Sequence, residues 1–297
     1  MIHLALALLL AQDSYKTEKT ADAVVVSSAG KEMLRYQFQK PADSKLAVES
    51  ACYFHPLTTP VGHVVTDVAP SDHKHHRGIF LAWFEMLGKK GADFWGWGQF
   101  APVKDRIILN REARDLNSGD AALFNVRNDW MAEDLRLVKE ELYVCFVRER
   151  SANILDLQYT LTADGDVKLP QRAFSGFCAR LRKDGKATIE SPEGEVKLPA
   201  PHHLKPESDW PAQPWYAFQI TLPDGPQVGC AVIDGPKNPK SLWHNPASIR
   251  MLNPCIIAPG EVVLKAGEPL RLHYQVVAWD GPTPRELLNR LAQVGTK

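Results

Sequence analysis

Short apolar runs separated by turn residues recur along the 297 residues of the chain. Several runs alternate apolar with polar positions, as in residues 271–276, which is the pattern of a half-buried strand. Gly30, Gly165, Gly185 and Gly225 lie in the turns between such runs and predict hairpin-type connections. The pattern predicts an all-β fold, an antiparallel β-sandwich or barrel, with strands at Ala23–Ser27, Met33–Phe38, Ile79–Phe84, Leu142–Arg148, Ile154–Leu161, Tyr216–Leu222, Val228–Ile233 and Leu270–Ala278.

Two regions depart from this strand pattern. The C-terminal segment predicts a short helix, with Thr283 as its cap, Pro284 at the first helical position, Glu286 completing a capping box and an apolar stripe of leucines behind them. Five prolines between residues 199 and 214 predict a long irregular loop. Loops of that length often carry function.

Length and composition restrict the organisation of the chain. All-β units of roughly 200–250 residues often form one domain, so we expect a single β-sandwich domain over residues 15–297. With 44% hydrophobic and 24% charged residues, the chain can close a hydrophobic core. Its formal net charge is zero and it has no long basic run, which argues against nucleic acid as a partner.

The N-terminus carries the longest continuous apolar run, Leu4–Ala11, followed by polar residues. It is far shorter than the roughly 20 residues that a membrane-spanning helix needs, so we expect no membrane span. Residues 1–14 are interpreted as a secretory signal segment, which predicts a periplasmic or secreted protein. Because no Lys or Arg precedes the run, a plain first strand in a cytoplasmic protein is the alternative.

Histidines are concentrated in one stretch. Five of the ten lie within 22 residues, and the run Asp72–Gly78 leads directly into the predicted strand that begins at Ile79. Clustered neutral imidazoles need a partner for each ring nitrogen, and protonated ones repel each other, so such a cluster is unfavourable without a purpose. The mouth of a strand is also a common position for a site. The five are His55, His63, His73, His75 and His76.

Three interpretations of this cluster remain open. His73 and His75, at positions i and i+2 of an extended chain, share one face and would bind a divalent metal together with Asp72, His55 or a distant histidine. Alternatively, His75 or His76 is a general acid or base and Arg77 stabilises negative charge on a substrate oxygen. In the third interpretation the histidines only hold a surface loop by hydrogen bonds.

The segment Asp93–Gly98 places two tryptophans, Trp95 and Trp97, beside glycines. Exposed Trp faces suit stacking on the apolar face of a sugar ring, and Asp93 would bind hydroxyl groups. Hydrophobic filling between two sheets is the alternative interpretation. The segment is therefore a candidate for binding a small-molecule carbohydrate.

Distant residues are candidates for the same pocket. Trp243 and His244 lie in a connection rich in Pro and Asn, which favours a second site element. Arg180 and Glu149 lie in or beside apolar strands, where a charge needs a partner. They would either reach the pocket or pair with each other.

The order of these elements resembles the bacterial PmoA-like family, from about Ala23 to Gly281. Some descriptions of that family call it methane oxygenase PmoA, and others call it a domain of unknown function. A methane monooxygenase subunit of this kind needs membrane-spanning helices, so that activity is rejected here. The resemblance implies an exported protein of polysaccharide-degrading bacteria with a β-supersandwich similar to the galactose mutarotase group. It rests on residues 53–56, 59–62, 70–78, 93–95, 176–180, 238–239 and 243–244.

Together these features favour a carbohydrate-active enzyme that hydrolyses, eliminates or epimerises a sugar or glycoside derivative. An enzyme of this kind predicts a deep pocket on which five side chains converge, those of His55, His75, His76, Arg77 and His244. The competing class is a non-catalytic carbohydrate-binding or scaffold module, which predicts a shallow aromatic platform. A divalent metal is the one cofactor that the pattern suggests, and the oligomeric state stays open.

Overall fold

Strict alternation of side chains explains the long strands of the molecule. In β10 (Leu135–Glu149), Leu142, Val144 and Phe146 are buried, whereas Glu141 and Tyr143, which alternate with them, are exposed. A strand turns successive side chains to opposite faces, so this sequence gives β10 one apolar face. The computed structural model describes residues 14–294, and its paired strands are antiparallel throughout.

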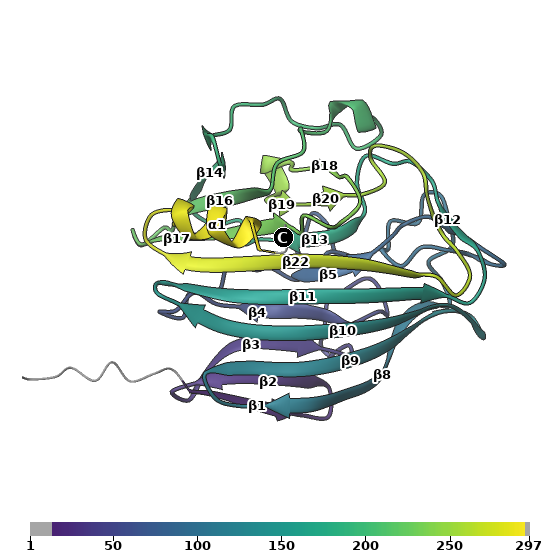
Figure 1. Cartoon of the computed structure of the whole chain (residues 1–297), viewed down its shortest axis with the longest axis horizontal. Coiled ribbons are helices and arrows are strands. Elements are labelled where there is room, and N and C mark those ends of the chain that lie inside the picture. The colour runs from purple at the N-terminus through teal and green to yellow at the C-terminus, as the bar shows by residue number, and fades with distance from the viewer. Residues whose placement is uncertain (1–13, 295–297) are drawn as a thin grey trace, which may run out of the picture.

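The strands form two large sheets (Figure 1). The first has seven strands in the order β1 (Tyr15–Lys19), β2 (Ala23–Ser28), β3 (Lys31–Gln37), β4 (Tyr53–Leu57), β5 (Ile79–Ala82), β13 (Gly176–Arg180) and β19 (Met251–Leu252). The second has nine, in the order β15 (Gly194–Glu195), β14 (Lys186–Ser191), β16 (Trp215–Thr221), β17 (Gln227–Asp234), β22 (Pro269–Asp280), β11 (Ala152–Ala163), β10, β9 (Ala121–Ala132) and β8 (Arg106–Asn117).

Two small sheets complete the described strands. One has four strands in the order β21 (Val262–Leu264), β12 (Val167–Leu169), β6 (Met86–Leu87) and β7 (Gly91–Ala92). The other pairs β18 (Leu242–Trp243) with β20 (Pro254–Cys255). Single turns of 3-10 helix lie at Pro206–Ser208 and Ala247–Ile249.

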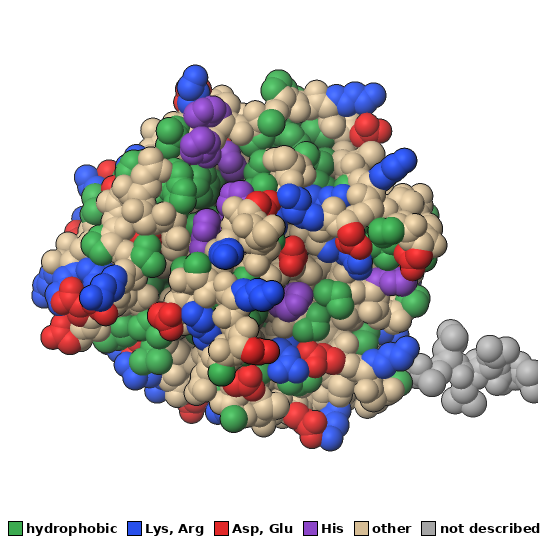
Figure 2. Space-filling view, turned by 180° about the vertical axis from the view of Figure 1, so that it is seen from behind, with side chains coloured by type: hydrophobic (Ala, Val, Ile, Leu, Met, Phe, Trp, Pro, Cys, Tyr) green, Lys and Arg blue, Asp and Glu red, His purple; other side chains and the backbone are tan. Residues whose placement is uncertain are grey.

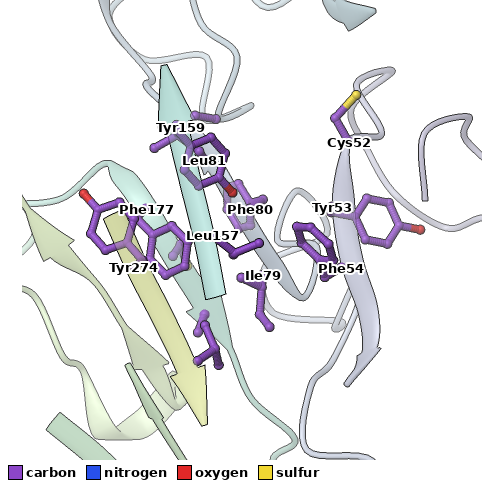
Figure 3. Close-up of a cluster of buried hydrophobic side chains, with 14 of the residues drawn as sticks. Cys52, Tyr53, Phe54, Ile79, Phe80, Leu81, Leu157, Tyr159, Phe177 and Tyr274 are labelled. Atoms are coloured by element: carbon purple, nitrogen blue, oxygen red, sulfur yellow. The ribbon is translucent and has the colours of Figure 1, made fainter. Parts of the chain in front are cut away.

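The two large sheets pack face to face around an aromatic core. Phe177 of β13 stacks on Tyr274 of β22, with ring centroids 4.1 Å apart, and so joins the seven-stranded to the nine-stranded sheet (Figure 3). Leu157 and Tyr159 of β11 and Phe80 of β5 are buried in the same core (Figure 3). The prediction of an antiparallel β-sandwich is confirmed.

The predicted C-terminal helix is present as α1 (Arg285–Ala292). It buries its leucine stripe against the other face of the nine-stranded sheet, where Trp215 and Trp279 lie. The predicted cap is wrong: Pro284 precedes the first helical residue without a side-chain cap, and the Thr283 hydroxyl donates to Gln219 Oε1 (2.8 Å). Because the helix packs beside β16, the Thr283 hydroxyl bonds to Gln219 of that strand and does not cap the helix.

All eight predicted strand stretches lie on observed strands, but other strands, among them β1, β4, β8, β9 and β14, were not predicted. The turns at Gly30 and Gly225 connect paired strands, as predicted. Those at Gly165 and Gly185 do not, because β11 and β13 are each followed by a strand of another sheet. Residues 1–13 of the predicted signal segment lie outside the described residues. Between residues 14 and 294 no helix has the length and apolar character to span a membrane.

Candidate functional site

A cavity of about 370 Å³ lies where five separate segments of the chain meet. Histidine is its most frequent lining residue, and Figure 2 shows histidine side chains gathered in a row beside hydrophobic ones on this part of the surface. The volume is in the range of about 300–1,000 Å³ typical of small-molecule pockets. The lining residues are His73, His75, His76, Trp97, Phe174, Pro201, His203, His244, Pro246, Ser248, Ile249 and Met251.

The histidine-rich segment is held by backbone hydrogen bonds to its surroundings. The Ala69 N–H donates to the carbonyl of His76, and the Gly78 N–H donates to the carbonyl of Asp67, at 2.8 Å each. Gly78 has a φ of +57°, a left-handed conformation that favours glycine, and a Cβ there would collide with the Phe54 carbonyl. The tight turn therefore places the histidines beside the start of β5, as the sequence predicts.

Three imidazoles of this segment form a compact group. The ring centroid of His76 lies 4.7 Å from that of His75 and 4.8 Å from that of His73. Burial lowers the pKa of His75 to about 4 and the pKa of His76 well below its ordinary value, and the neighbouring imidazoles and arginines act in the same direction. At neutral pH these rings are uncharged, so each offers one N–H donor and one lone pair.

Arg180 lies directly behind His76. Its Nη1 is 3.4 Å from His76 Nδ1, and its Nη2 donates to both carboxylate oxygens of Asp72 at 2.8 and 3.1 Å. Lys183 also donates to Asp72 (2.9 Å). Burial alone would raise the pKa of Asp72, but these two cations hold it well below its usual range. The predicted approach of Arg180 to the histidine site is thus observed, whereas a pair with Glu149 is not.

His244 enters the cavity from the opposite part of the sequence. Its Nδ1 is 2.7 Å from Oδ1 of Asp209, and both side chains are almost completely buried. Burial raises the pKa of Asp209, although the hydrogen bond with His244 opposes the effect. Its other oxygen, Oδ2, is buried without a hydrogen-bond partner. A carboxylate can only accept, so it holds His244 as the Nδ1–H tautomer and leaves Nε2 with a lone pair.

The backbone explains how residues so far apart in the chain meet. Trp210 and Trp243 form an antiparallel bridge, with N–H to carbonyl distances of 2.9 Å in both directions. This bridge sets Asp209 beside His244, and the Trp210 indole donates to the carbonyl of Pro199 (2.7 Å). The proline-rich loop predicted from the sequence therefore supplies the partner of His244.

Sequence reasoning did not select Asp209 or His203 as site residues. His203 lines the cavity, and its ring centroid lies 5.9 Å from that of Trp97. The signal that could have found both is the long proline-rich loop between residues 199 and 214, because it contains His203 and Asp209 and loops of that length often carry function.

Trp97 and Phe174 form the aromatic part of the lining, with ring centroids 5.1 Å apart. Asp93 fixes the Trp97 loop, because its carboxylate accepts the backbone N–H groups of Gly96 and Gly98 at 2.6 Å each. Burial raises the pKa of Asp93 to about 6 in spite of these bonds. Asp93, predicted to bind substrate, is therefore engaged within its own loop.

Two of the tryptophans predicted to bind substrate are core residues. Trp95 and Trp243 are fully buried and do not line the cavity. Trp95 packs against Phe80 and Phe174, and Trp243 packs against Tyr216. Hydrophobic filling, the alternative interpretation of the Asp93–Gly98 segment, describes Trp95, and Trp243 is likewise a core residue.

Three predicted catalytic residues also lie away from the lining. The fully buried Arg77 donates to the carbonyls of Phe94 (2.9 Å), Trp95 and His75 and stacks on the Phe80 ring. His55 Nδ1 lies 2.9 Å from the hydroxyl of Thr66, and burial lowers the pKa of His55 to about 4. Glu149 pairs with Arg290 of α1 near the surface. The structure thus brings His75, His76 and His244 together, but not His55, Arg77 or Glu149.

The predicted metal set of Asp72, His73 and His75 is not formed. Within residues 14–294, no group of three or more His, Cys, Asp or Glu side chains is arranged to hold a metal ion. Asp72 turns both oxygens to Arg180 and Lys183, and the rings of His73 and His75 have centroids 5.7 Å apart. The two cations occupy the carboxylate that the metal would need.

Similar solved structures include a GH36 α-galactosidase from Geobacillus stearothermophilus (TM-score 0.42, 9% identity, 91% of this chain and 39% of that one). A galactose mutarotase related enzyme from Lactobacillus acidophilus has a TM-score of 0.39 and 8% identity, over 91% of this chain and 98% of that one. A galactose mutarotase-like protein from Lactobacillus casei has a TM-score of 0.37 and 12% identity, over 89% of this chain and 99% of that one. The chain spans about 40% of the length of the α-galactosidases it matches. At these identities and TM-scores, neither substrate nor reaction is inferred.

No curated protein matches the chain. A family model described as "Family of unknown function (DUF6807)" matches residues 23–293. That description does not contain the name PmoA, so the PmoA-like resemblance stays a prediction.

Proposed function

This chain belongs to DUF6807, a family of unknown function, and we propose that it is an enzyme that moves protons on a small carbohydrate. The reaction is a hydrolysis, an elimination or an epimerisation of a sugar or glycoside derivative. The observation that carries the proposal is the buried pair of His244 and Asp209 at the wall of a histidine-lined cavity.

The pair supports general base catalysis by His244. Asp209 holds the Nδ1–H of the imidazole at 2.7 Å, so the lone pair on Nε2 is available to take a proton from a bound molecule. After the transfer, the buried carboxylate stabilises the positive charge of the imidazolium. His75 and His76 on the same lining offer further neutral imidazoles for hydrogen bonds to hydroxyl groups.

The composition of the lining supports a carbohydrate as the substrate. A sugar ring has an apolar face of C–H groups and a rim of hydroxyls. Trp97 and Phe174 offer aromatic surface to the first, and the imidazoles offer donors and acceptors to the second. A cavity of about 370 Å³ is suited to a small ligand rather than to a long polysaccharide bound along a groove.

Turnover of a panel of methyl glycosides, unoxidised and with a ring carbonyl, tests the proposal. We expect the wild-type protein to convert at least one of them and His244→Gln to lose about 10²–10⁴-fold in rate, the usual range for a general base. His273→Gln is the matched control, because His273 pairs with Asp156 at 2.9 Å but does not line the cavity. Binding without turnover in the whole panel would instead identify a carbohydrate-binding module.

A further inference from the structure

We propose that the substrate carries a carbonyl group, and that His76, fixed by Arg180 as a neutral N–H donor, stabilises the oxyanion that forms when His244 removes the neighbouring proton. This inference rests on the proposed function and narrows it to elimination or epimerisation. It assigns different tasks to two histidines that share one cavity.

The tautomer of His76 follows from its neighbour. A guanidinium has five N–H groups and no acceptor, so across the 3.4 Å to Arg180 Nη1 the His76 Nδ1 can only accept. The proton of the neutral ring is then on Nε2. Protonation of Nδ1 would place a second positive charge against Arg180 inside the protein, where His76 is only 2% exposed.

Arg180 is itself held in place. Asp72 accepts two hydrogen bonds from Nη2, and the Arg180 backbone N–H donates to the carbonyl of Gly78 (2.8 Å) at the end of the histidine segment. Arg180 is therefore a positioning residue, which acts on the substrate only through the ring of His76.

The two histidines consequently have opposite hydrogen-bonding roles. Asp209 leaves His244 with a lone pair on Nε2, whereas Arg180 leaves His76 with a proton on Nε2. A lone pair that takes a proton and a neutral imidazole N–H that polarises a carbonyl are the two groups needed to form an enolate, as in triosephosphate isomerase. A neutral imidazole is a weak acid. It is therefore better suited to donate a hydrogen bond to an oxygen that gains negative charge than to transfer a proton to a leaving group.

Glycoside hydrolysis requires a different pair of groups. Most glycosidases place two carboxyl groups on either side of the glycosidic bond. In the described part of the chain, the residues that line the cavity include no Asp or Glu, and Asp209 behind them is bonded to His244. The donors and acceptors present match enolate formation.

The reaction balances without a further reactant. Nε2 of His244 takes a proton from the carbon beside the carbonyl, the C–H electron pair becomes a C=C bond, and the carbonyl π electrons move to oxygen, which accepts a hydrogen bond from His76 Nε2–H. Return of a proton to the carbon gives exchange or epimerisation. Alternatively, an oxygen substituent on the β carbon leaves and takes the proton from the His244 imidazolium, which completes an elimination.

Hydrogen–deuterium exchange in D₂O tests the proposal with matched probes. These are methyl β-D-glucopyranoside, methyl β-D-galactopyranoside and the 3-oxo derivative of each, followed by ¹H NMR and mass spectrometry against a buffer blank. We expect the wild-type protein either to place deuterium beside the carbonyl of a 3-oxo sugar or to convert that sugar to a product with a new C=C bond, and to leave both unoxidised glycosides unchanged. His76→Phe should lower the rate roughly 10²-fold, as loss of an oxyanion donor does.

Two results would overturn this inference but leave the proposed function standing. One is turnover of the unoxidised glycosides, and the other is conversion of a 3-oxo glycoside to a product that has neither a new C=C bond nor solvent deuterium beside the carbonyl. Binding of every sugar with no chemical change would refute both. Loss of exchange in His273→Gln, which lies outside the cavity, would also contradict the assignment.

The role of Arg180 has a readout that does not depend on activity. Long-range ¹H–¹⁵N NMR, with the signal identified by its loss in His76→Phe, should show the Nε2–H tautomer of His76. In Arg180→Lys the new side chain can still only donate, so His76 should keep the Nε2–H tautomer. In Arg180→Gln the amide oxygen can accept a hydrogen bond, so His76 should also populate the Nδ1–H tautomer. An Nδ1–H ring in the wild-type protein would overturn the proposal.

Discussion

Replacement of Asp209 by Asn changes one hydrogen bond and leaves the shape of the site intact. The carboxylate accepts from His244 Nδ1 at 2.7 Å, and its second oxygen is buried without a partner. If the amide of Asn turned its oxygen to His244, its NH₂ group would take the place of the second carboxylate oxygen, where it would have no acceptor, and an unpaired buried donor is costly. The amide nitrogen should therefore face Nδ1 and force the proton onto Nε2.

The expected loss is large because the wrong tautomer cannot accept a proton. In serine proteases the equivalent Asp to Asn change lowers kcat about 10⁴-fold, and we expect a similar factor for Asp209→Asn, or about 5 kcal/mol in the activation barrier. The Asp209 side chain has no exposed surface, so water cannot substitute for it. Since burial raises the pKa of Asp209, a neutral amide should be tolerated and the fold retained.

The assay compares kcat of the wild-type protein and Asp209→Asn on the best substrate of the glycoside panel, with thermal unfolding as a check of the fold. Asp156→Asn is the matched control, because Asp156 accepts from His273 at 2.9 Å outside the cavity. If Asp209→Asn stayed within tenfold of wild type, or if Asp156→Asn lost as much, His244 would not be the base.

Three further changes test other parts of the structure. Trp97→Ala should weaken sugar binding about tenfold, measured by calorimetry, whereas Trp97→Phe should keep most of it; equal binding by all three proteins would remove Trp97 from the site. Gly78→Ala should lower the free energy of unfolding by at least about 1–3 kcal/mol in urea, since the left-handed backbone and the Phe54 carbonyl both oppose a Cβ; an unchanged midpoint would show that the turn adapts. Burial raises the pKa of Glu140 from 4.5 to about 7, so the folded protein binds a proton that the unfolded chain releases over that range. Stability should therefore fall by about 3 kcal/mol as the pH rises from 4.5 to 7, and Glu140→Gln should flatten the slope.

The candidate site shows what a sequence pattern can find. His73, His75 and His76 are neighbours in the chain, so one tight turn is enough to bring them together, and the run of residues predicted their grouping. His244 was found because it lies in a Pro- and Asn-rich connection, which favours a site element. The pairing of His244 with Asp209 could not be predicted in this way, because the two residues are brought together only by the backbone bridge between Trp210 and Trp243.

Buried charges were the hardest residues to interpret from sequence. Arg180 was rightly expected to have an anionic partner, but the partner is Asp72 and not Glu149. Arg77 lies next to the histidines in sequence, but it follows the turns of that segment and forms an antiparallel bridge with Val68. Its side chain is buried in the core, where backbone carbonyls receive its N–H groups.

The sequence by itself determined the all-β class, eight strands of the sandwich, the C-terminal helix and the histidine segment. These are local properties, set by alternation of side chains, by turn residues and by one glycine in a left-handed conformation. Only the tertiary structure decided which strands pair, which tryptophans fill the core and which acid meets His244. Those choices depend on the packing of two sheets against each other, where contacts form between residues far apart in the chain and only the whole fold determines which side chains share a cavity.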